Sequence, residues 1–436
     1  MAEKSSTSIQ VPFMADNNPS LSSDNDLNDT VLDKHLAKLE SFLRVFGFCQ
    51  DSILSTILSW LAFGVIAILL PLWTIYYAYC SNCEHYQIRT FELEIFTSQV
   101  VVSAISLLCI SHNLRKYGVR KLLFVDRLHG HMSQFRHQYV QKIQVFYRLV
   151  ATWVVVCFLL KTAREVTRAV YLRDELWWWA VIILVASLIS WTYSTILFLL
   201  GAALFNLAGN LQVIHFENYG KLLERDLDIS VYIEEHMRLT QYLSKISHRF
   251  RIFLLLEFLV VSASQFVALL QTTGNKGIIN FINGGDFAVL SIVELVGIVL
   301  CLNAAAKISH RAQALGAVAS RWHVLVTCNS NDASASGISN NGGNLEFPNP
   351  VGHLSVNYSE SDLESNDFVA LPGNVLTSQM PSYHKRQAFV TYVKSNTRGF
   401  TIFGWMVDRM LINTIFFIEL SLVFFVLGKT ITITTR

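Results

Sequence analysis

The sequence predicts an all-α membrane protein that crosses the bilayer seven times. Of its 436 residues, 52% are hydrophobic and only 15% are charged, far from the average of soluble domains. The apolar residues gather into seven blocks, each about as long as the ~20 residues that a membrane helix needs. A soluble core supplies one or two such runs, so we do not expect a large soluble enzyme. The blocks cover Ser52–Tyr79, Phe91–Ile110, Val145–Lys161, Leu176–Phe205, Ile252–Thr272, Asp286–Ala306 and Met410–Gly428.

The distribution of Lys and Arg between the blocks predicts the orientation. If the N-terminus lies in the cytosol, 24 of the 34 Lys and Arg residues fall on the cytosolic side and 8 fall outside, with Arg148 and Arg251 at span edges. Cytosolic loops of membrane proteins carry an excess of these residues. We therefore expect the N-terminus inside and the C-terminus outside.

Composition divides the chain into four regions. Residues 1–32 are rich in Ser, Asn and Asp and are expected to be a disordered tail. Residues 33–325 should hold spans one to six with helical extensions into the cytosol, because the helical apolar period continues beyond the spans. Residues 326–383 predict a disordered cytosolic loop, and residues 384–436 a short cytosolic helix followed by span seven. Pro71, which lies inside the first span, is expected to kink that helix.

Polar residues inside the spans are the candidates for function, because a buried charge costs a few kcal/mol unless it is paired or hydrated. Glu294 and Glu419 lie near the middles of spans six and seven, at comparable depth. With Ser421 and Asn413 of span seven, they are our candidates for a pore or polar pathway. The alternative is that the two carboxyls form hydrogen bonds to neighbouring helices.

Two further pairs of residues are expected to be structural. Arg148 and Glu257 lie near the cytosolic ends of spans three and five and are expected to form an ion pair. Cys80 and Cys83 lie just beyond the first span, on the expected outer side. A local disulfide is the preferred interpretation, with metal binding and free thiols as alternatives. We expect no cofactor and no metal site, and the absence of a Lys/Arg-dense tract argues against nucleic-acid binding.

Two segments carry a resemblance to a known family. They are the run CISHNLRKYG at Cys109–Gly118 and the final block Asp408–Thr430, which contains TIFFIELSL. Both resemble a plant family of unknown function whose members are called gustatory-receptor-like proteins. The resemblance extends from about Asp33 to the C-terminus. It implies fold-level similarity to insect odorant and gustatory receptors, which have seven helices, a cytosolic N-terminus and a cytosolic anchor built from helix extensions.

The same resemblance implies a tetramer in which the seventh helix lines a ligand-gated cation pore. The insect signature in that helix is Thr-Tyr, five residues, then Gln-Phe. Aligned on Thr414, this chain has Ile415 in place of Tyr and Ser421-Leu422 in place of Gln-Phe. No ligand-contacting residues are therefore carried over to this chain.

The expected function is that of a receptor-like membrane protein, with an oligomeric ligand-gated cation channel as its specific form. A non-conducting signalling scaffold is one alternative, which the 326–383 loop would suit. A small-solute transporter is another, although the sequence has no internal repeat of the kind common in transporters. The expected partners are the lipid bilayer, further copies of the chain and a small molecule. The expected location is the plasma membrane, with an endomembrane as the alternative.

Overall fold

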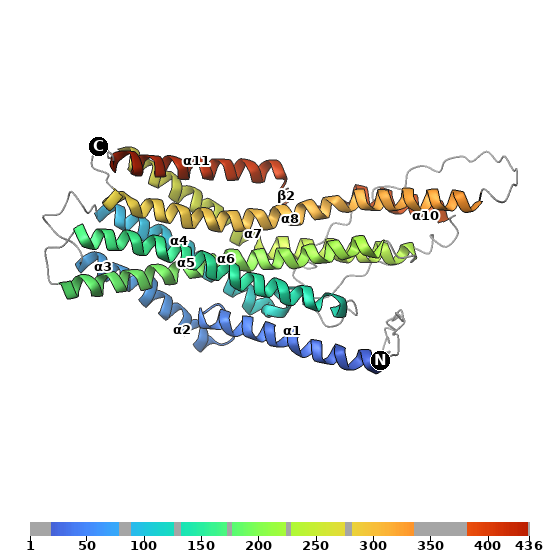
Figure 1. Cartoon of the computed structure of the whole chain (residues 1–436), viewed down its shortest axis with the longest axis horizontal. Coiled ribbons are helices and arrows are strands. Elements are labelled where there is room, and N and C mark those ends of the chain that lie inside the picture. Colours follow the sequence, from blue (N-terminus) through green and yellow to red (C-terminus); the bar gives the residue numbers. More distant parts are fainter. Residues whose placement is uncertain are drawn as a thin grey trace, which may run out of the picture.

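The computed structural model describes residues 19–77, 89–125, 132–171, 177–223, 228–274, 281–334 and 382–434. Over these residues the chain is almost entirely helical (Figure 1). Its elements are α1 (Pro19–Val45), α2 (Ile53–Phe63), the π-helix η1 (Gly64–Leu69), α3 (Leu70–Tyr77), α4 (Arg89–Leu122), α5 (Met132–Tyr171), α6 (Trp177–Leu222), α7 (Ile229–Gly274), α8 (Phe281–Ser334), α10 (Ser382–Ser395), β1 (Thr401–Ile402), β2 (Trp405–Met406) and α11 (Arg409–Thr434).

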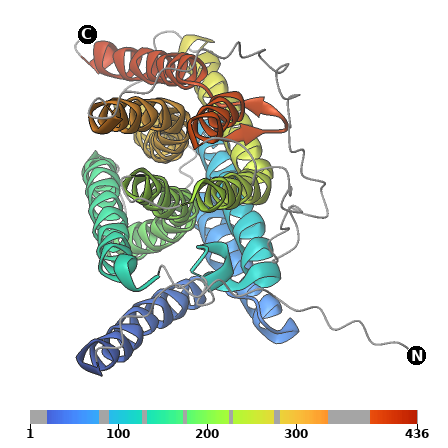
Figure 2. The same ribbon diagram turned by 90° about the vertical axis from the view of Figure 1, so that its right-hand side faces the viewer.

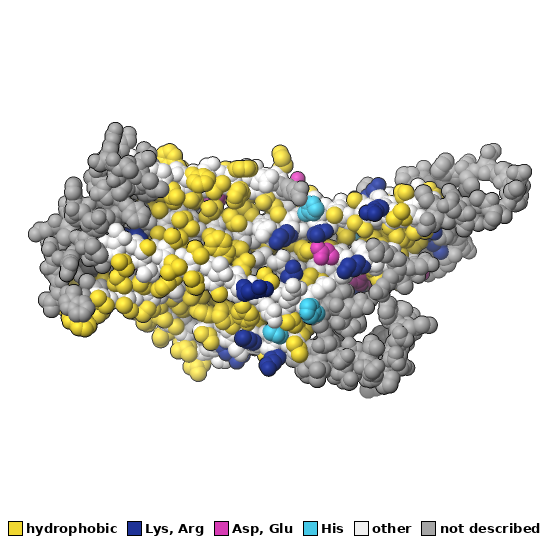
Figure 3. Space-filling view, viewed as in Figure 1, with side chains coloured by type: hydrophobic (Ala, Val, Ile, Leu, Met, Phe, Trp, Pro, Cys, Tyr) yellow, Lys and Arg dark blue, Asp and Glu magenta, His cyan; other side chains and the backbone are white. Residues whose placement is uncertain are grey.

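The described residues contain seven candidate membrane spans, the number that the sequence predicts. Taking α2, η1 and α3 as one unit, seven helical segments are long and apolar enough to cross a membrane. Hydrophobic side chains cover the broad part of the molecule, whereas Lys and Arg gather toward the end where α10 lies (Figure 3). The chain is therefore a multi-pass membrane protein with a polar part at one end.

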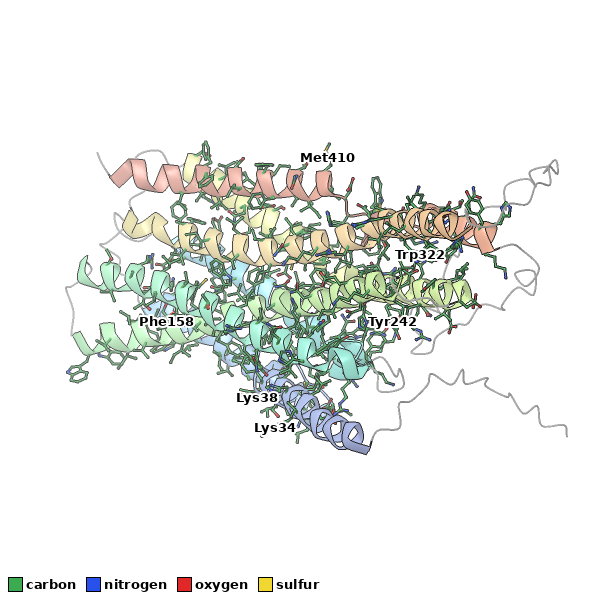
Figure 4. All side chains as sticks on the ribbon, turned by 45° about the vertical axis from the view of Figure 1, so that its right-hand side comes forward. Lys34, Lys38, Phe158, Tyr242, Trp322 and Met410 are labelled. Carbon is green, nitrogen blue, oxygen red and sulfur yellow. The ribbon has the colours of Figure 1, made fainter. Side chains whose placement is uncertain are left out.

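Three helices extend far beyond the membrane. The lengths of α6, α7 and α8 are 46, 46 and 54 residues, or roughly 70–80 Å, against the ~30 Å of a hydrocarbon core. We call α10 and the parts of α6, α7 and α8 beside it the stalk. Its core is aromatic: the ring of Tyr232 lies 5.5 Å from that of Trp322 and 5.9 Å from that of Phe389. Figure 4 labels Trp322 and Tyr242 in the stalk.

The first span is irregular just before its proline. Gly64–Leu69 forms a π-helix, and the backbone N–H of Leu70 bonds to the carbonyl of Val65, five residues earlier. Pro71 has no N–H, and its ring crowds the carbonyl four residues before it. The wider π turn makes room for that ring. The disturbance that the sequence predicts at Pro71 therefore takes the form of a π-helix.

Two boundaries differ from the predictions. The helix α1 begins at Pro19, inside the tail that was expected to be disordered, because proline suits the first turn of a helix, where the N–H has no partner. The helix α8 continues to Ser334, past the predicted start of the loop at 326, because no proline precedes Pro348 there. Residues 1–18 and 335–381 lie outside the described residues.

A two-stranded hairpin that was not predicted joins α10 to α11. Thr401 pairs with Met406 and Ile402 pairs with Trp405. Between the strands, Phe403 and Gly404 both have positive φ, of 48° and 83°, as a tight two-residue hairpin turn requires. The hairpin ends directly before α11, whose first turn contains Met410 (Figure 4).

Gly118 interrupts α4 with φ 71° and ψ 163°, a conformation that essentially only glycine adopts. A methyl group there would meet no atom within 4 Å, so Gly118→Ala tests backbone strain alone. We expect a loss of about 1–3 kcal/mol in the free energy of unfolding, measured as a lower melting temperature in detergent. The control is Gly64→Ala, because Gly64 has helical φ and ψ of −60° and −42° and equally open surroundings. Equal melting temperatures for the two variants would contradict the assignment of strain.

Candidate functional site

Glu294 lies at the centre of a polar layer that joins α4, α7 and α8. The Ser98 hydroxyl donates to Glu294 Oε1 at 2.8 Å, and Gln265 Nε2 donates to Glu294 Oε2 at 2.6 Å. The hydroxyls of Ser98 and Ser264 are 2.7 Å apart. Glu294 itself is buried. We call these four residues the Glu294 layer; in it, the carboxyl is hydrogen-bonded to neighbouring helices inside the bundle.

Glu419 of α11 also points into the bundle. Its side chain is buried, and the Ser262 hydroxyl of α7 donates to its Oε1. The other oxygen, Oε2, is buried without a hydrogen-bond partner among the described residues. Glu419 interacts electrostatically with Glu294. The two carboxyls predicted for the pathway thus lie close together on the inner side of α11.

Asn413 and Ser421 lie on the opposite side of α11, and both are exposed. The Ser421 hydroxyl donates to the carbonyl of Phe417 in its own helix at 2.6 Å, whereas the amide of Asn413 stands at an exposed position. Figure 2 places α11 at the edge of the bundle. Of the four pathway candidates, Glu294 of α8 and Glu419 of α11 therefore lie inside the bundle, whereas Asn413 and Ser421 lie on the exposed side of α11.

The predicted ion pair of Arg148 with Glu257 is wrong. Arg148 is exposed on α5, whereas Glu257 of α7 is fully buried. Neither carboxylate oxygen of Glu257 has a hydrogen-bond partner among the described residues. The prediction matched the two residues by depth, which fixes the height of a residue in the membrane but not the direction of its side chain.

Four buried charged side chains that the sequence analysis did not group join α5 to α8. We call Lys161, Arg164, Glu165 and Asp286 the α5–α8 charge cluster. Each side chain is 8% exposed or less, and Glu92 of α4 also acts electrostatically on Arg164. Lys161 also lies 5.9 Å from the ring centroid of Trp191. Lys161 Nζ is 2.8 Å from Glu165 Oε1 and 2.7 Å from Asp286 Oδ1, and Arg164 Nη1 is 2.9 Å from Glu165 Oε1 and 2.7 Å from Asp286 Oδ2.

A sequence signal for this cluster existed. Lys161, Arg164 and Glu165 follow the i, i+3, i+4 spacing that places side chains on one helix face. Asp286 is the first residue of the sixth apolar block. Lys161 and Asp286 both stand at the ends of predicted spans. The pairing across about 120 residues of chain could not be derived from spacing alone.

The run Cys109–Gly118 holds α4 against α7 at the end of the membrane part nearer the stalk. The Asn113 side-chain amide donates to the backbone carbonyl of Arg249 at 2.8 Å. The Arg249 guanidinium donates to the carbonyl of Lys121 at 2.7 Å and lies 3.9 Å from the ring centroid of Tyr117. This motif therefore has a packing role in the chain.

The described cysteines and metal-ligating side chains are dispersed over the chain. Cys80 and Cys83 lie outside the described residues, so the predicted disulfide stays a prediction. Before the first span, burial raises the pKa of the Cys49 thiol to about 11, which keeps it protonated and unreactive at neutral pH. Among the described residues, no group of three His, Cys, Asp or Glu side chains is placed to hold a metal ion. The described free cysteines are Cys49, Cys109, Cys157 and Cys301.

Comparison with known proteins identifies one family. A family model described as "Protein of unknown function (DUF3537)" matches residues 34–418. No curated protein and no solved structure matches the chain.

Proposed function

The chain belongs to the DUF3537 family of proteins of unknown function, and for this member we propose a receptor-like membrane protein that assembles into a cation channel. In this proposal several copies surround a common axis, and the outer side of α11 from each copy lines the path. A tetramer is the assembly that the resemblance to insect chemoreceptors implies.

The observation that carries the proposal is the polarity of α11. Its inner side packs on α7 and α8, where Glu419 is buried against Ser262. Its outer side is exposed, and Asn413, Thr414 and Ser421 lie there among exposed apolar side chains such as Phe417 and Phe424. An exposed amide costs free energy in lipid unless it finds a hydrogen-bond partner, and water in a path between copies would supply one.

The polar residues of the outer side are arranged along the membrane normal. Asn413, Phe417 and Ser421 follow each other at four-residue intervals, which places them along one helix face. At 1.5 Å per residue, Asn413 and Ser421 are about 12 Å apart along the helix. In the proposed channel they supply two successive polar rings, and the exposed ring of Phe417 forms an apolar constriction between them.

We place the stalk in the cytosol and the C-terminus outside. The support is the excess of Lys and Arg on the segments that share a side with the N-terminus, together with the gathering of these residues toward the stalk (Figure 3). The plasma membrane is the location we propose. The stalk offers each copy a polar surface for contacts with its neighbours.

Cysteine substitution in reconstituted protein tests the path. We expect a charged, membrane-impermeant thiol reagent to reduce cation currents several-fold in Asn413→Cys and Ser421→Cys, because the reagent reaches water-filled positions only. The matched control is Thr152→Cys on α5, since Thr152 is also exposed but would face lipid. Wild-type protein gives the background from the native cysteines. Equal block in the control, or no current from any assembly, would reject the proposal.

A small-solute transporter is the second candidate function. The Glu294 layer favours it, because this polar layer lies inside a single copy, between α4, α7 and α8. Uptake by monomeric protein that is abolished in Glu294→Gln and unchanged in Asn413→Cys would select this candidate over the channel.

A further inference from the structure

Polar contacts recur along the interface between α4 and α7, which run antiparallel. They occur near both ends and close to the middle of the two helices. Glu257 of α7 lies between the contact at Ser264 and the contact at Arg249. Its carboxylate oxygens have no hydrogen-bond partner in the described chain. At the end farther from the stalk, Gln271 Nε2 donates to Glu94 Oε1 at 2.6 Å. Near the middle, the hydroxyls of Ser98 and Ser264 are 2.7 Å apart. At the end nearer the stalk, Asn113 Nδ2 donates to the Arg249 carbonyl at 2.8 Å.

Glu257 is the most completely enclosed carboxyl of this interface. Its exposed fraction is 0%, and both its oxygens lack a hydrogen-bond partner among the described residues. By contrast, Glu294 receives hydrogen bonds from two side chains of neighbouring helices. The two carboxyls therefore differ in their surroundings: hydrogen bonds from neighbouring side chains stabilise Glu294, and Glu257 receives none among the described residues.

The ionisable groups around Glu257 offer no counter-charge. It interacts electrostatically with Cys109 of α4 and with Cys301 and Glu294 of α8. Thiols are weak hydrogen-bond donors, and a second carboxylate repels the first. The helix α6 carries no ionisable side chain from residue 194 to 214, and Glu419 of α11 interacts with Glu294.

An ionised carboxylate is not stable in such a place, because neither water nor a cationic side chain compensates for its lost hydration. Either a metal cation or a proton must neutralise it. A metal cation needs several ligands, and among the described residues no group of three His, Cys, Asp or Glu side chains is placed to hold one. A proton needs neither additional ligands nor additional space.

We propose that Glu257 is a proton-binding site inside the bundle, and that loss of its proton loosens α7 from α4 and α8. Eight residues, or about 12 Å of helix, separate Glu257 from Arg249, which lies at the stalk end of this interface. Proton exchange is therefore expected from the stalk side, through transient separation of α4 and α7. The packing of the membrane part therefore depends on the pH on the stalk side. This proposal holds whether or not the protein conducts ions.

The test uses the full chain in lipid nanodiscs and compares wild type with Glu257→Gln. Glutamine has nearly the shape of the protonated acid, and its amide stays neutral over the whole pH range of the experiment. We expect the wild type to show the infrared carbonyl band of a protonated carboxylic acid at neutral pH, and Glu257→Gln to lack part of that band. We also expect the wild-type melting temperature to fall at alkaline pH and the variant to lose most of this fall. Glu94→Gln is the control, because Glu94 already receives a hydrogen bond from Gln271 and its variant should keep the alkaline fall.

Four results would overturn the proposal. One is an unchanged carbonyl band in Glu257→Gln, which would mean that Glu257 is ionised. Another is an alkaline fall of the same size in Glu257→Gln and wild type. The third is a variant that melts below wild type at neutral pH, combined with a wild-type melting temperature that rises with added sodium or potassium, since that would identify a metal cation as the ligand. If Glu257→Gln does not fold at neutral pH, the neutral-acid assignment also fails, because the two side chains are isosteric.

Discussion

Replacing Asp286 with asparagine is expected to destabilise the membrane part by about 3–5 kcal/mol, which is the cost of leaving a buried charge uncompensated. Asp286 bonds to both cations of the α5–α8 charge cluster, with distances of 2.7 Å to Lys161 Nζ and 2.7 Å to Arg164 Nη1. Its loss leaves two buried cations with Glu165 as the remaining carboxylate of the cluster. We expect a large drop in melting temperature, or a loss of monodisperse protein, in fluorescence-detected size-exclusion chromatography.

An exposed ion pair gives the matched control. Glu217 Oε1 lies 2.9 Å from Arg311 Nη2, but both side chains are about half exposed. Because water screens such a pair, Glu217→Gln should cost only about 0–1 kcal/mol. The same chemical change thus has a large effect in the cluster and a small one in the stalk. Equal effects of the two substitutions would contradict the role of burial.

A double variant distinguishes the loss of charge balance from the loss of packing as the cause of the destabilisation. In the double variant Asp286→Asn, Lys161→Met, one cation and one anion are removed together, and the 2.9 Å contact of Arg164 with Glu165 keeps a balanced pair. We expect the double variant to recover a substantial part of the stability lost in Asp286→Asn, as coupled residues do in a mutant cycle. A double variant that is as unstable as the sum of the two single variants would show that charge balance is not the cause.

The seven spans could be predicted because they depend on composition and length, which are local properties of the sequence. The continuity of α6, α7 and α8 was predictable for a similar reason, since the apolar period and the lack of proline both extend beyond the membrane. The charge cluster was not predictable to the same degree. Asp286 and Arg164 come from different helices, and only packing decides whether two span edges meet.

Side-chain direction was the weaker part of the site prediction, although the spacing held a signal. On a helix, Glu419 lies about 240° from Asn413 and about 200° from Ser421, so one face cannot hold all three residues. The structure accordingly buries Glu419 and exposes the other two. For Arg148 and Glu257, depth suggested a pair, but the Arg148 side chain is exposed on α5 whereas that of Glu257 is buried on α7.

Gly297→Val is the second variant with a large expected effect, because it acts where α6 and α8 approach each other. A Cβ atom at Gly297 would lie 2.1 Å from Cζ and 2.6 Å from Cε1 of the Phe198 ring. That ring is buried, so it has little room to turn. Membrane helices that pack closely use small residues at the contact, and overpacking of such a contact costs about 1–3 kcal/mol or more. The control is Gly64→Val in the first span, where an added Cβ would meet nothing within 4 Å.

The cause of the loss can be assigned to one ring by a second substitution. Phe198→Ala alone should destabilise the protein, because it leaves a cavity where a buried aromatic side chain was. Combined with Gly297→Val, the same substitution removes the clash and lets the valine fill part of the cavity. We therefore expect the double variant to melt no lower than Gly297→Val alone, with melting temperatures measured in the same detergent. Additive losses would place the clash elsewhere, and a Gly297→Val protein that melts like wild type would mean that α6 and α8 can move apart without cost.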